Sequence, residues 1–125
     1  SRSTLAPAPD LLQRNFKVAK QDDIWVSDTT FIPTREGWLF LAVVLDLFSR
    51  QVIGWAMSKS NNTSLVQDAL TMAIWRRGKV EGVTVHSDQG STYASGDYRK
   101  QLARHHLICS MARKGACSGN GVAEG

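Results

Sequence analysis

Three stretches in the first half of the chain have the composition of β-strands. Residues 24–33, IWVSDTTFIP, are rich in β-branched and aromatic types, and residues 38–49 form the nearly continuous apolar run that is typical of strands buried on both faces. A third run, QVIGWAMS at residues 51–58, follows a break at Ser49 and Arg50. Because only short turns separate the three runs, they predict an antiparallel meander.

The second half alternates between helical and strand patterns. Apolar residues at helical spacing indicate a first helix: Leu65, Ala69, Met72 and Ala73. Thr63 or Ser64 is its candidate N-cap, and Gly78 ends it. Short strands at residues 83–87 and 107–112 enclose a second helix at residues 96–106. A glycine-rich loop then leads to VAEG, which has the pattern of a helix that begins as the sequence stops.

This order of elements predicts an α/β fold with a mixed five-stranded sheet. The three-strand meander is joined by parallel strands and flanked by helices, the last of them truncated. With 125 residues and 42% hydrophobic content, we expect one domain: a core at residues 21–125, truncated at its C-terminus, after an N-terminal linker at residues 1–20. No apolar run approaches the roughly 20 residues of a membrane span, so no membrane partner is expected.

Charge and cysteine content add two weaker indications. The net charge of +4 is a modest bias towards polyanionic partners, and the segment from Arg99 to Lys114 holds five basic residues and no acidic one. The same cluster is equally typical of a solvated helix face. Cys109 and Cys117 are too few and too far apart for a disulfide framework or a zinc site. They are expected to be buried free thiols in a reducing, intracellular compartment.

Asp28 is the first carboxylate that calls for an explanation. Side chains alternate along a strand, so Val26, Asp28 and Thr30 point to the same face. A carboxylate in the middle of an apolar strand is costly to bury and needs a cation, a set of hydrogen bonds or a metal. The alternative is an edge strand on which Asp28 is exposed.

Two further carboxylates could join Asp28. Asp88 ends the strand VTVHSD, where ligands collect in α/β sheets, although an aspartate is also common at the start of a turn. Glu124 begins the last helix, with 35 residues and a helix-strand path between it and Asp88. Asp46 is the main rival, but Ser49 and Arg50 offer it ordinary partners, so it is interpreted as structural. Three carboxylates form an all-oxygen site suited to Mg²⁺ or Mn²⁺.

Four motifs now stand in a recognisable order: WVSDTTFI, AVVLDLFSRQVIGWAMS, VHSDQGSTYAS and the stretch from SMARKG to NGVAE. Together they resemble the integrase-like core of bacterial insertion-sequence transposases encoded by a second reading frame. The similarity runs from about Asn15 to Glu124. Asp28, Asp88 and Glu124 match the Asp-Asp-Glu triad of that family.

The resemblance implies a ribonuclease H-like fold and an enzyme that cleaves DNA and transfers its strands with two Mg²⁺ or Mn²⁺ ions. In that scheme Asp28 bridges both ions, while Asp88 and Glu124 each bind one. The implied partners are the DNA of the element's ends and of the target, bound by a homo-oligomer in the bacterial cytoplasm.

The resemblance also implies further site residues. Gln89, Gly90 and Tyr93 are candidates for holding the second aspartate and nearby DNA, and His86 is either an outer-shell donor or a structural histidine. Arg113 and Lys114 are candidate phosphate contacts. Asn120, in a Gly-Asn-Gly segment where the family has Asp-Asn-Ala, is another candidate DNA contact and could cap the last helix.

Two other functions stay open on the sequence. The early stop and the altered Gly-Asn-Gly segment favour a truncated, non-catalytic remnant that binds DNA weakly. A ribonuclease H-like nuclease that only hydrolyses is the other alternative.

Overall fold

The computed structural model describes residues 8–12 and 17–112 of the chain. Its elements, in chain order, are β1 (Ile24–Thr34), β2 (Gly37–Asp46), β3 (Gln51–Ser58), α1 (Thr63–Arg77), β4 (Thr84–Ser87), α2 (Ser91–Ala94), α3 (Gly96–Arg104) and β5 (Ile108–Met111). Within this part of the chain, no helix is long and apolar enough to cross a membrane.

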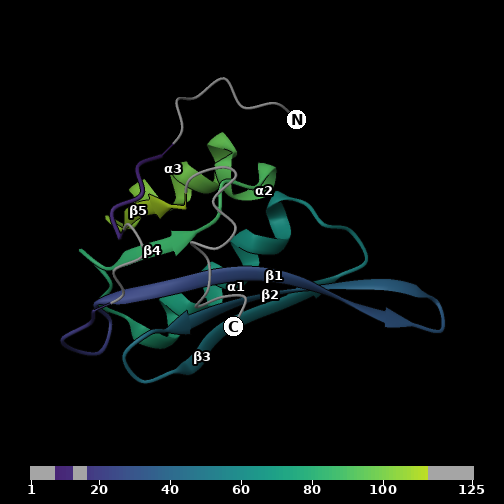
Figure 1. Ribbon diagram of the computed structural model, residues 1–125, viewed down its shortest axis with the longest axis horizontal. Helices are drawn as coiled ribbons and strands as arrows, with labels where there is room; N and C mark the ends of the chain where they lie inside the picture. The colour runs from purple at the N-terminus through teal and green to yellow at the C-terminus, as the bar shows by residue number, and fades with distance from the viewer. Residues whose placement is uncertain (1–7, 13–16, 113–125) are drawn as a thin grey trace.

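The five strands form one mixed sheet in the order β3-β2-β1-β4-β5 (Figure 1). Strands β1, β2 and β3 pair antiparallel as the predicted meander, and β4 and β5 extend the sheet in parallel from β1. The predicted mixed five-stranded α/β sheet is therefore confirmed. Strand β1 lies between β2 and β4, in the centre of the sheet, so it is not an edge strand.

The main core lies between one face of the sheet and the helices. Trp25, Ala42 and Val44 are fully buried there with the apolar stripe of α1. Helix α1 and strand β3 approach so closely that a Cβ at Gly54 would clash with the carbonyl oxygen of Ala69. Only glycine fits at this position, which fixes α1 against the sheet.

The opposite face of the sheet carries a smaller apolar cluster formed by the segment before β1. Leu12 packs there with Ile24, Val26 and Leu47, and Val18 covers them in part. The amide of Leu11 also donates a hydrogen bond to Ser110 Oγ at 2.9 Å. The described parts of the expected linker thus pack on the domain, and the boundary at residue 20 stays a prediction.

Residues 8–12 also contact the segments that follow β4 and β5. The Met111 amide donates to the carbonyl oxygen of Pro9 at 2.9 Å, and the Ala112 amide donates to that of Ser87 at 2.7 Å. Gln89 Nε2 donates to the carbonyl oxygen of Ala8 at 2.9 Å. These bonds hold residues 8–12, the end of β5 and the segment after β4 together.

The local structure differs from the sequence expectations in several places, and helix α3 ends at Arg104 and not at residue 106. The N-cap of α1 is Asn62, whose Oδ1 accepts a hydrogen bond from the Leu65 amide at 3.2 Å, in place of Thr63 or Ser64. Strand β2 ends at Asp46, because residues 47–50 turn the chain towards β3. Helix α2 was not predicted, since four residues are too few to show helical periodicity. The helix expected near residue 122 lies outside the described residues.

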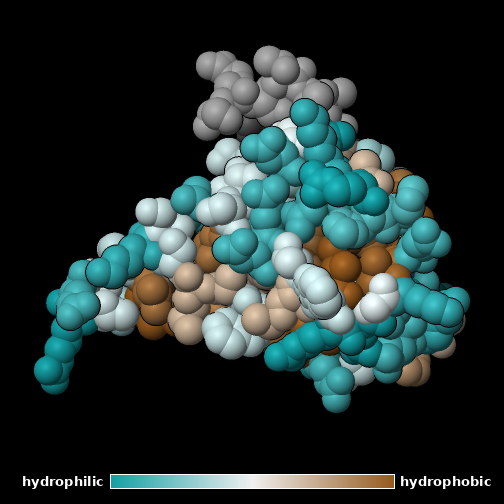
Figure 2. All heavy atoms as spheres, turned by 180° about the vertical axis from the view of Figure 1, so that it is seen from behind, coloured by the Kyte–Doolittle hydropathy of each residue, from teal (hydrophilic) through white to brown (hydrophobic). Residues whose placement is uncertain are grey.

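The β1–β2 hairpin projects beyond the helices at the right of Figure 1 and forms the narrow arm at the left of Figure 2. Two aromatic rings on this hairpin, Phe31 and Trp38, are more than half exposed and meet edge to face with centroids 4.8 Å apart.

Candidate active site

The register of the parallel strands brings Asp28 and Asp88 together. Val26 of β1 lies opposite His86 of β4, and Asp28 and Asp88 are each two residues further along. Two residues of extended chain return a side chain to the same face, and neighbouring strands lie about 4.8 Å apart. The two carboxylates therefore lie at the same level of the sheet, on the face opposite α1.

Asp28 occupies the centre of the sheet and is half-buried. One of its oxygens, Oδ1, accepts a hydrogen bond from the Thr29 amide at 2.9 Å. Because β1 is paired on both sides, the interpretation of Asp28 as an exposed edge residue is wrong. Asp28 is a carboxylate that the fold holds inside the sheet.

Asp88 is held by the loop that follows it. Its Oδ1 accepts a hydrogen bond from the Gly90 amide at 2.7 Å. A Cβ at residue 90 would lie 2.8 Å from that same oxygen, so the loop can close on the carboxylate only with glycine there. The expected role of Gly90 in holding the second aspartate is consistent with this contact, whereas the Gln89 side chain is engaged by Ala8.

Tyr93 lies on the other face of the sheet, directly behind Asp28. Its hydroxyl is 2.9 Å from Thr29 Oγ1 and accepts a hydrogen bond from Ser27 Oγ at 3.2 Å, and these two residues flank Asp28 in β1. Burial raises the pKa of Tyr93, and the charges of Asp28 and Asp88 raise it further. The side chain is 2% exposed. Tyr93 therefore braces β1 behind Asp28 and offers almost no exposed surface to DNA.

His86 is buried one step below Asp88 on the same face. Its Nδ1 lies 2.8 Å from Ser110 Oγ on the neighbouring strand β5. Burial lowers the pKa of His86, and the nearby charges of Asp10 and Asp88 offset part of that effect. The geometry fits both expected roles, since the ring is held by a structural partner and also lies within the field of Asp88.

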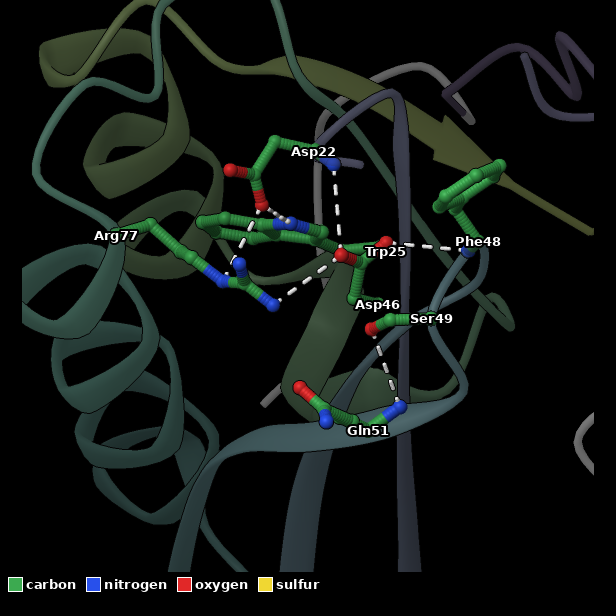
Figure 3. Close-up of polar contacts among 7 residues, drawn as sticks. All are labelled: Asp22, Trp25, Asp46, Phe48, Ser49, Gln51 and Arg77. Atoms are coloured by element: carbon green, nitrogen blue, oxygen red, sulfur yellow. Dashed lines mark hydrogen bonds and ion pairs between the residues drawn. The ribbon is translucent and has the colours of Figure 1, made fainter. Parts of the chain in front are cut away.

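Asp46 belongs to a separate polar cluster at the end of the sheet where β1 begins and β2 stops (Figure 3). Its carboxylate is fully buried and accepts hydrogen bonds from Arg77 Nη2 at 3.2 Å and from the Phe48 amide at 3.1 Å. Arg77 also pairs with Asp22, which in turn accepts a hydrogen bond from Trp25 Nε1 at 3.0 Å. Asp46 is therefore structural, as expected.

The partners of Asp46 are nevertheless not the expected ones. Ser49 Oγ accepts from the Gln51 amide at 3.4 Å, and Arg50 reaches Asp46 only through a backbone bond of 2.7 Å. The charge of Asp46 is balanced from α1, 31 residues away. Ser49 and Arg50 shape the turn instead.

Four expected site residues, Arg113, Lys114, Asn120 and Glu124, lie outside the described residues. Among the residues that are described, no group of three or more His, Cys, Asp or Glu side chains is arranged to bind a metal ion. The structure thus brings together two of the three carboxylates of the expected triad, Asp28 and Asp88.

An antiparallel meander that continues into parallel strands, with helices on one face and paired carboxylates at the junction, is the architecture of integrase-type catalytic domains. Residues 18–117 match the family described as "Integrase core domain". The chain belongs to this family.

The curated relatives are bacterial transposases. The chain is 47% identical over 120 residues to transposase InsF for insertion sequence IS3A of Escherichia coli (strain K12), covering 96% of this chain and 42% of that protein. It is 40% identical over 116 residues to the transposase for insertion sequence element IS904 of Lactococcus lactis subsp. lactis (strain IL1403), covering 93% of this chain and 46% of that protein. The chain therefore spans less than half the length of these relatives.

Solved structures with the same fold are viral integrases. One is the simian T-cell lymphotropic virus intasome in complex with PP2A regulatory subunit B56 gamma, with a TM-score of 0.73 and 22% identity, covering 82% of this chain and 36% of that one. Another is the HTLV-2 integrase catalytic core domain in complex with magnesium, with a TM-score of 0.64 and 20% identity, covering 82% and 66%. These likenesses confirm the expected ribonuclease H-like fold.

Proposed function

We propose that this chain supplies the catalytic core of a transposase that cleaves DNA and joins the freed end to a second DNA strand. The observation that carries the proposal is the parallel register that pairs Val26 of β1 with His86 of β4, two residues before Asp28 and Asp88 respectively. Family membership, with transposases as curated relatives, supports the same reaction class.

The residues at the site fit a divalent metal centre. Asp28 and Asp88 offer carboxylate oxygens, the donors that Mg²⁺ and Mn²⁺ prefer, and the spacing of Glu124 makes it the proposed third ligand. When bound, a pair of such ions activates the attacking oxygen and stabilises the leaving oxygen of a phosphoryl transfer. The magnesium complex of the HTLV-2 domain supports this choice of metal.

The chain's own residues hold the two aspartates in place. The Gly90 amide fixes one Asp88 oxygen, while the hydroxyls of Ser27, Thr29 and Tyr93 fasten the strand that carries Asp28. Fixed ligands reduce the reorganisation that metal binding and catalysis would otherwise require.

The proposed partner is DNA, both at the element's ends and at the target, bound by a homo-oligomer in the bacterial cytoplasm. Gln89, Arg113, Lys114 and Asn120 are the proposed contacts with DNA near the site. Gln89 adjoins Asp88 in the chain, and the other three belong to the basic or glycine-rich stretch after β5. The intasome assembly of the simian T-cell lymphotropic virus relative supports action as an assembly on DNA.

The test compares DNA cleavage and strand transfer by the protein with those of its Asp28→Asn and Asp88→Asn variants in Mg²⁺ and Mn²⁺. Both variants should lose activity by more than about 100-fold, since even loss of an outer partner of a metal ligand costs 10–100-fold. The matched control is Asp68→Asn, which removes an exposed carboxylate from α1 and should retain activity. Activity that survives Asp88→Asn would refute the proposed mechanism.

Two further measurements separate the alternatives. A substrate with a pre-cleaved 3′-hydroxyl end should give joined products, whereas an enzyme that only hydrolyses would give none. Calorimetric titration with Mn²⁺ should show binding that both aspartate variants weaken. If the unmodified protein binds no Mn²⁺, the chain is a non-catalytic remnant.

A further inference from the structure

A pocket of about 650 Å³ opens between the end of α1 and the end of α3. It lies beside the C-terminal ends of these two helices, on the same side of the sheet as the main core. Figure 2 shows the molecule from behind the view of Figure 1, with hydrophobic residues exposed among hydrophilic ones. The pocket is lined by Ile74, Gly78, Lys79, Val80, Glu81, Arg104, His105 and His106.

The lining combines an apolar base with a rim that is rich in donors. Ile74 and Val80 are the apolar members, and Lys79 and Arg104 are exposed cations. His105 and His106 add ring nitrogens, and Glu81 is the single acidic member. A guanidinium and an ammonium group offer eight N–H donors between them and no acceptor, which suits an anionic ligand.

Neither cation has a partner within the described part of the chain. The ion pairs there belong to Arg77, which joins Asp22 and Asp46. Surface cations that lack such a pair keep their full attraction for an anion that arrives from solution.

Helix capping does not account for these side chains. The carbonyl oxygen of Ile74 is already bonded to the Gly78 amide, and the last carbonyls of α3 accept bonds from the amides of His106 and Leu107. Cations near a helix end are favourable with the helix dipole, but Arg76 and Arg77 already serve the last turn of α1. Lys79 lies beyond the helix and is free for another role.

We propose that the pocket between α1 and α3 binds backbone phosphates of DNA at a distance from the carboxylate site. The inference rests on the proposed function, since it assigns a second DNA contact to the same protein. Arg104 and Lys79 would contact the phosphates, and the histidine rings would add donors. Because the contacts are to the backbone, they bind without regard to sequence.

The position of the pocket determines which DNA it can reach. It lies before the start of β4, whereas Asp88 follows the end of that strand, and four residues of extended chain span about 13 Å. The pocket also lies on the helical face, and the two aspartates lie on the opposite face. A phosphate bound there belongs to a segment of DNA other than the one at the reacting bond.

The experiment measures how DNA affinity depends on salt. The probe is a labelled duplex of about 25 base pairs, in EDTA so that no cleavage occurs, titrated between about 50 and 200 mM KCl. Lys79→Ala and Arg104→Ala should each lower the slope of log affinity against log salt by about 0.9, the value for one phosphate contact. Glu81→Gln should raise the affinity, because it removes the one acidic group of the pocket.

Arg76→Ala is the matched control. It removes an exposed cation from the same end of α1. Gln101 of α3 bonds to Gln67 and Thr71 of α1, and Arg76, nine residues after Gln67, lies on the opposite side of the helix, so the slope of this variant should stay that of the unmodified protein. Urea unfolding of each variant checks that the fold is intact. A variant that unfolds early is replaced by Lys79→Gln or Arg104→Gln.

The outcomes separate this inference from the proposed function. If the unmodified protein binds the duplex and both pocket variants keep its slope, the pocket is not a phosphate site, while the transposase proposal stands. If Arg76→Ala lowers the slope as much as the pocket variants do, general charge explains the effect and the inference fails. If the pocket variants lower the slope of log affinity against log salt but Asp88→Asn stays active, the phosphate site in the pocket is supported. The proposed catalytic mechanism is then refuted.

Discussion

The hydroxyl of Tyr93 lies 2.9 Å from the hydroxyl of Thr29, across the sheet from the neighbouring Asp28. Tyr93 follows Asp88 by five residues, so a single side chain joins the segments that carry the two aspartates. Tyr98 packs edge to face on Tyr93 with ring centroids 5.3 Å apart, which holds the Tyr93 ring in place.

Replacing Tyr93 with phenylalanine should lower the free energy of unfolding by about 1–2 kcal/mol, because the buried hydroxyl of Ser27 and the half-buried hydroxyl of Thr29 lose their partner. Urea unfolding measures this loss. The change should also weaken Mn²⁺ binding, since β1 is less firmly held behind Asp28.

Tyr98→Phe is the natural comparison. The Tyr98 hydroxyl is buried and faces Ser27 without completing a hydrogen bond within the described residues. Its removal should leave stability unchanged or raise it slightly. Equal destabilisation by the two substitutions would contradict the bracing role of Tyr93.

The ion pair between Arg77 and Asp46 gives a second prediction. The Arg77→Met variant leaves a fully buried carboxylate without its cation, so it should lose about 3–5 kcal/mol of stability. The neighbouring Arg76→Met change removes an exposed charge and should stay within about 0.5 kcal/mol of the unmodified protein. Thermal or urea unfolding of the two variants measures the difference in stability. A mild effect of Arg77→Met would show that water or another group compensates the charge of Asp46.

Gly90 offers a test of the carboxylate geometry without a change of charge. Alanine can adopt the backbone angles of Gly90, φ −57° and ψ 155°, so the substitution should not strain the loop. The added methyl group must instead displace the Asp88 carboxylate, which lies 2.8 Å from the position of the new Cβ. Gly90→Ala should weaken Mn²⁺ binding measured by calorimetry while the urea midpoint changes little.

Gly96→Ala serves as its control, because a Cβ at that position meets nothing within 4 Å. It should leave metal binding intact and favour helix α3 slightly. Equal metal affinity in the two alanine variants would mean that Gly90 does not position Asp88.

Cys109 provides a prediction that depends on pH. It is a free thiol, and burial raises its pKa, although Arg99 offsets part of the effect. A raised pKa leaves less thiolate at neutral pH, so Cys109 should react with iodoacetamide several-fold more slowly than an unfolded thiol. In a Cys117→Ser background, the rate in the folded chain should keep rising above about pH 8.5, where an ordinary thiol levels off. Equal rates in the presence and absence of urea would contradict this.

The sequence predicted the strands well because their composition is extreme and their turns are short. It also indicated Asp28, since a carboxylate within an apolar strand is unusual by local rules. Asp88 is ordinary by those rules, because aspartate is common where a strand ends in a turn, and it was indicated by its place at a strand end and by the motif VHSDQGSTYAS. The register between β1 and β4 could not be predicted from the sequence, because it depends on how β4 packs beside β1.

What the sequence could not show are contacts between residues far apart in the chain. Nothing in the sequence indicates Arg77 as the partner of Asp46. Tyr93 was a candidate for holding the second aspartate and nearby DNA, but its bonds to Ser27 and Thr29 behind Asp28 depend on how distant segments pack. Ser27 and Thr29 flank Asp28 and break an otherwise apolar strand with hydroxyls, so they were a usable indication that the strand has polar partners behind it. The sequence does not single out Asn62 as the N-cap because five consecutive residues, 60–64, are all able to cap.

The hydrogen bonds from Gln89 to Ala8 and from Ala112 to Ser87 have a consequence for how this domain can be combined with others. They place Ala8, before β1, and Ala112, after β5, next to the short segment that contains Asp88. A module joined ahead of Ala8 and one joined behind Ala112 would start from the same end of the sheet, where β4 and β5 stop. The length of the tether, and not the order of modules along the gene, would then set how far each can reach from the carboxylates.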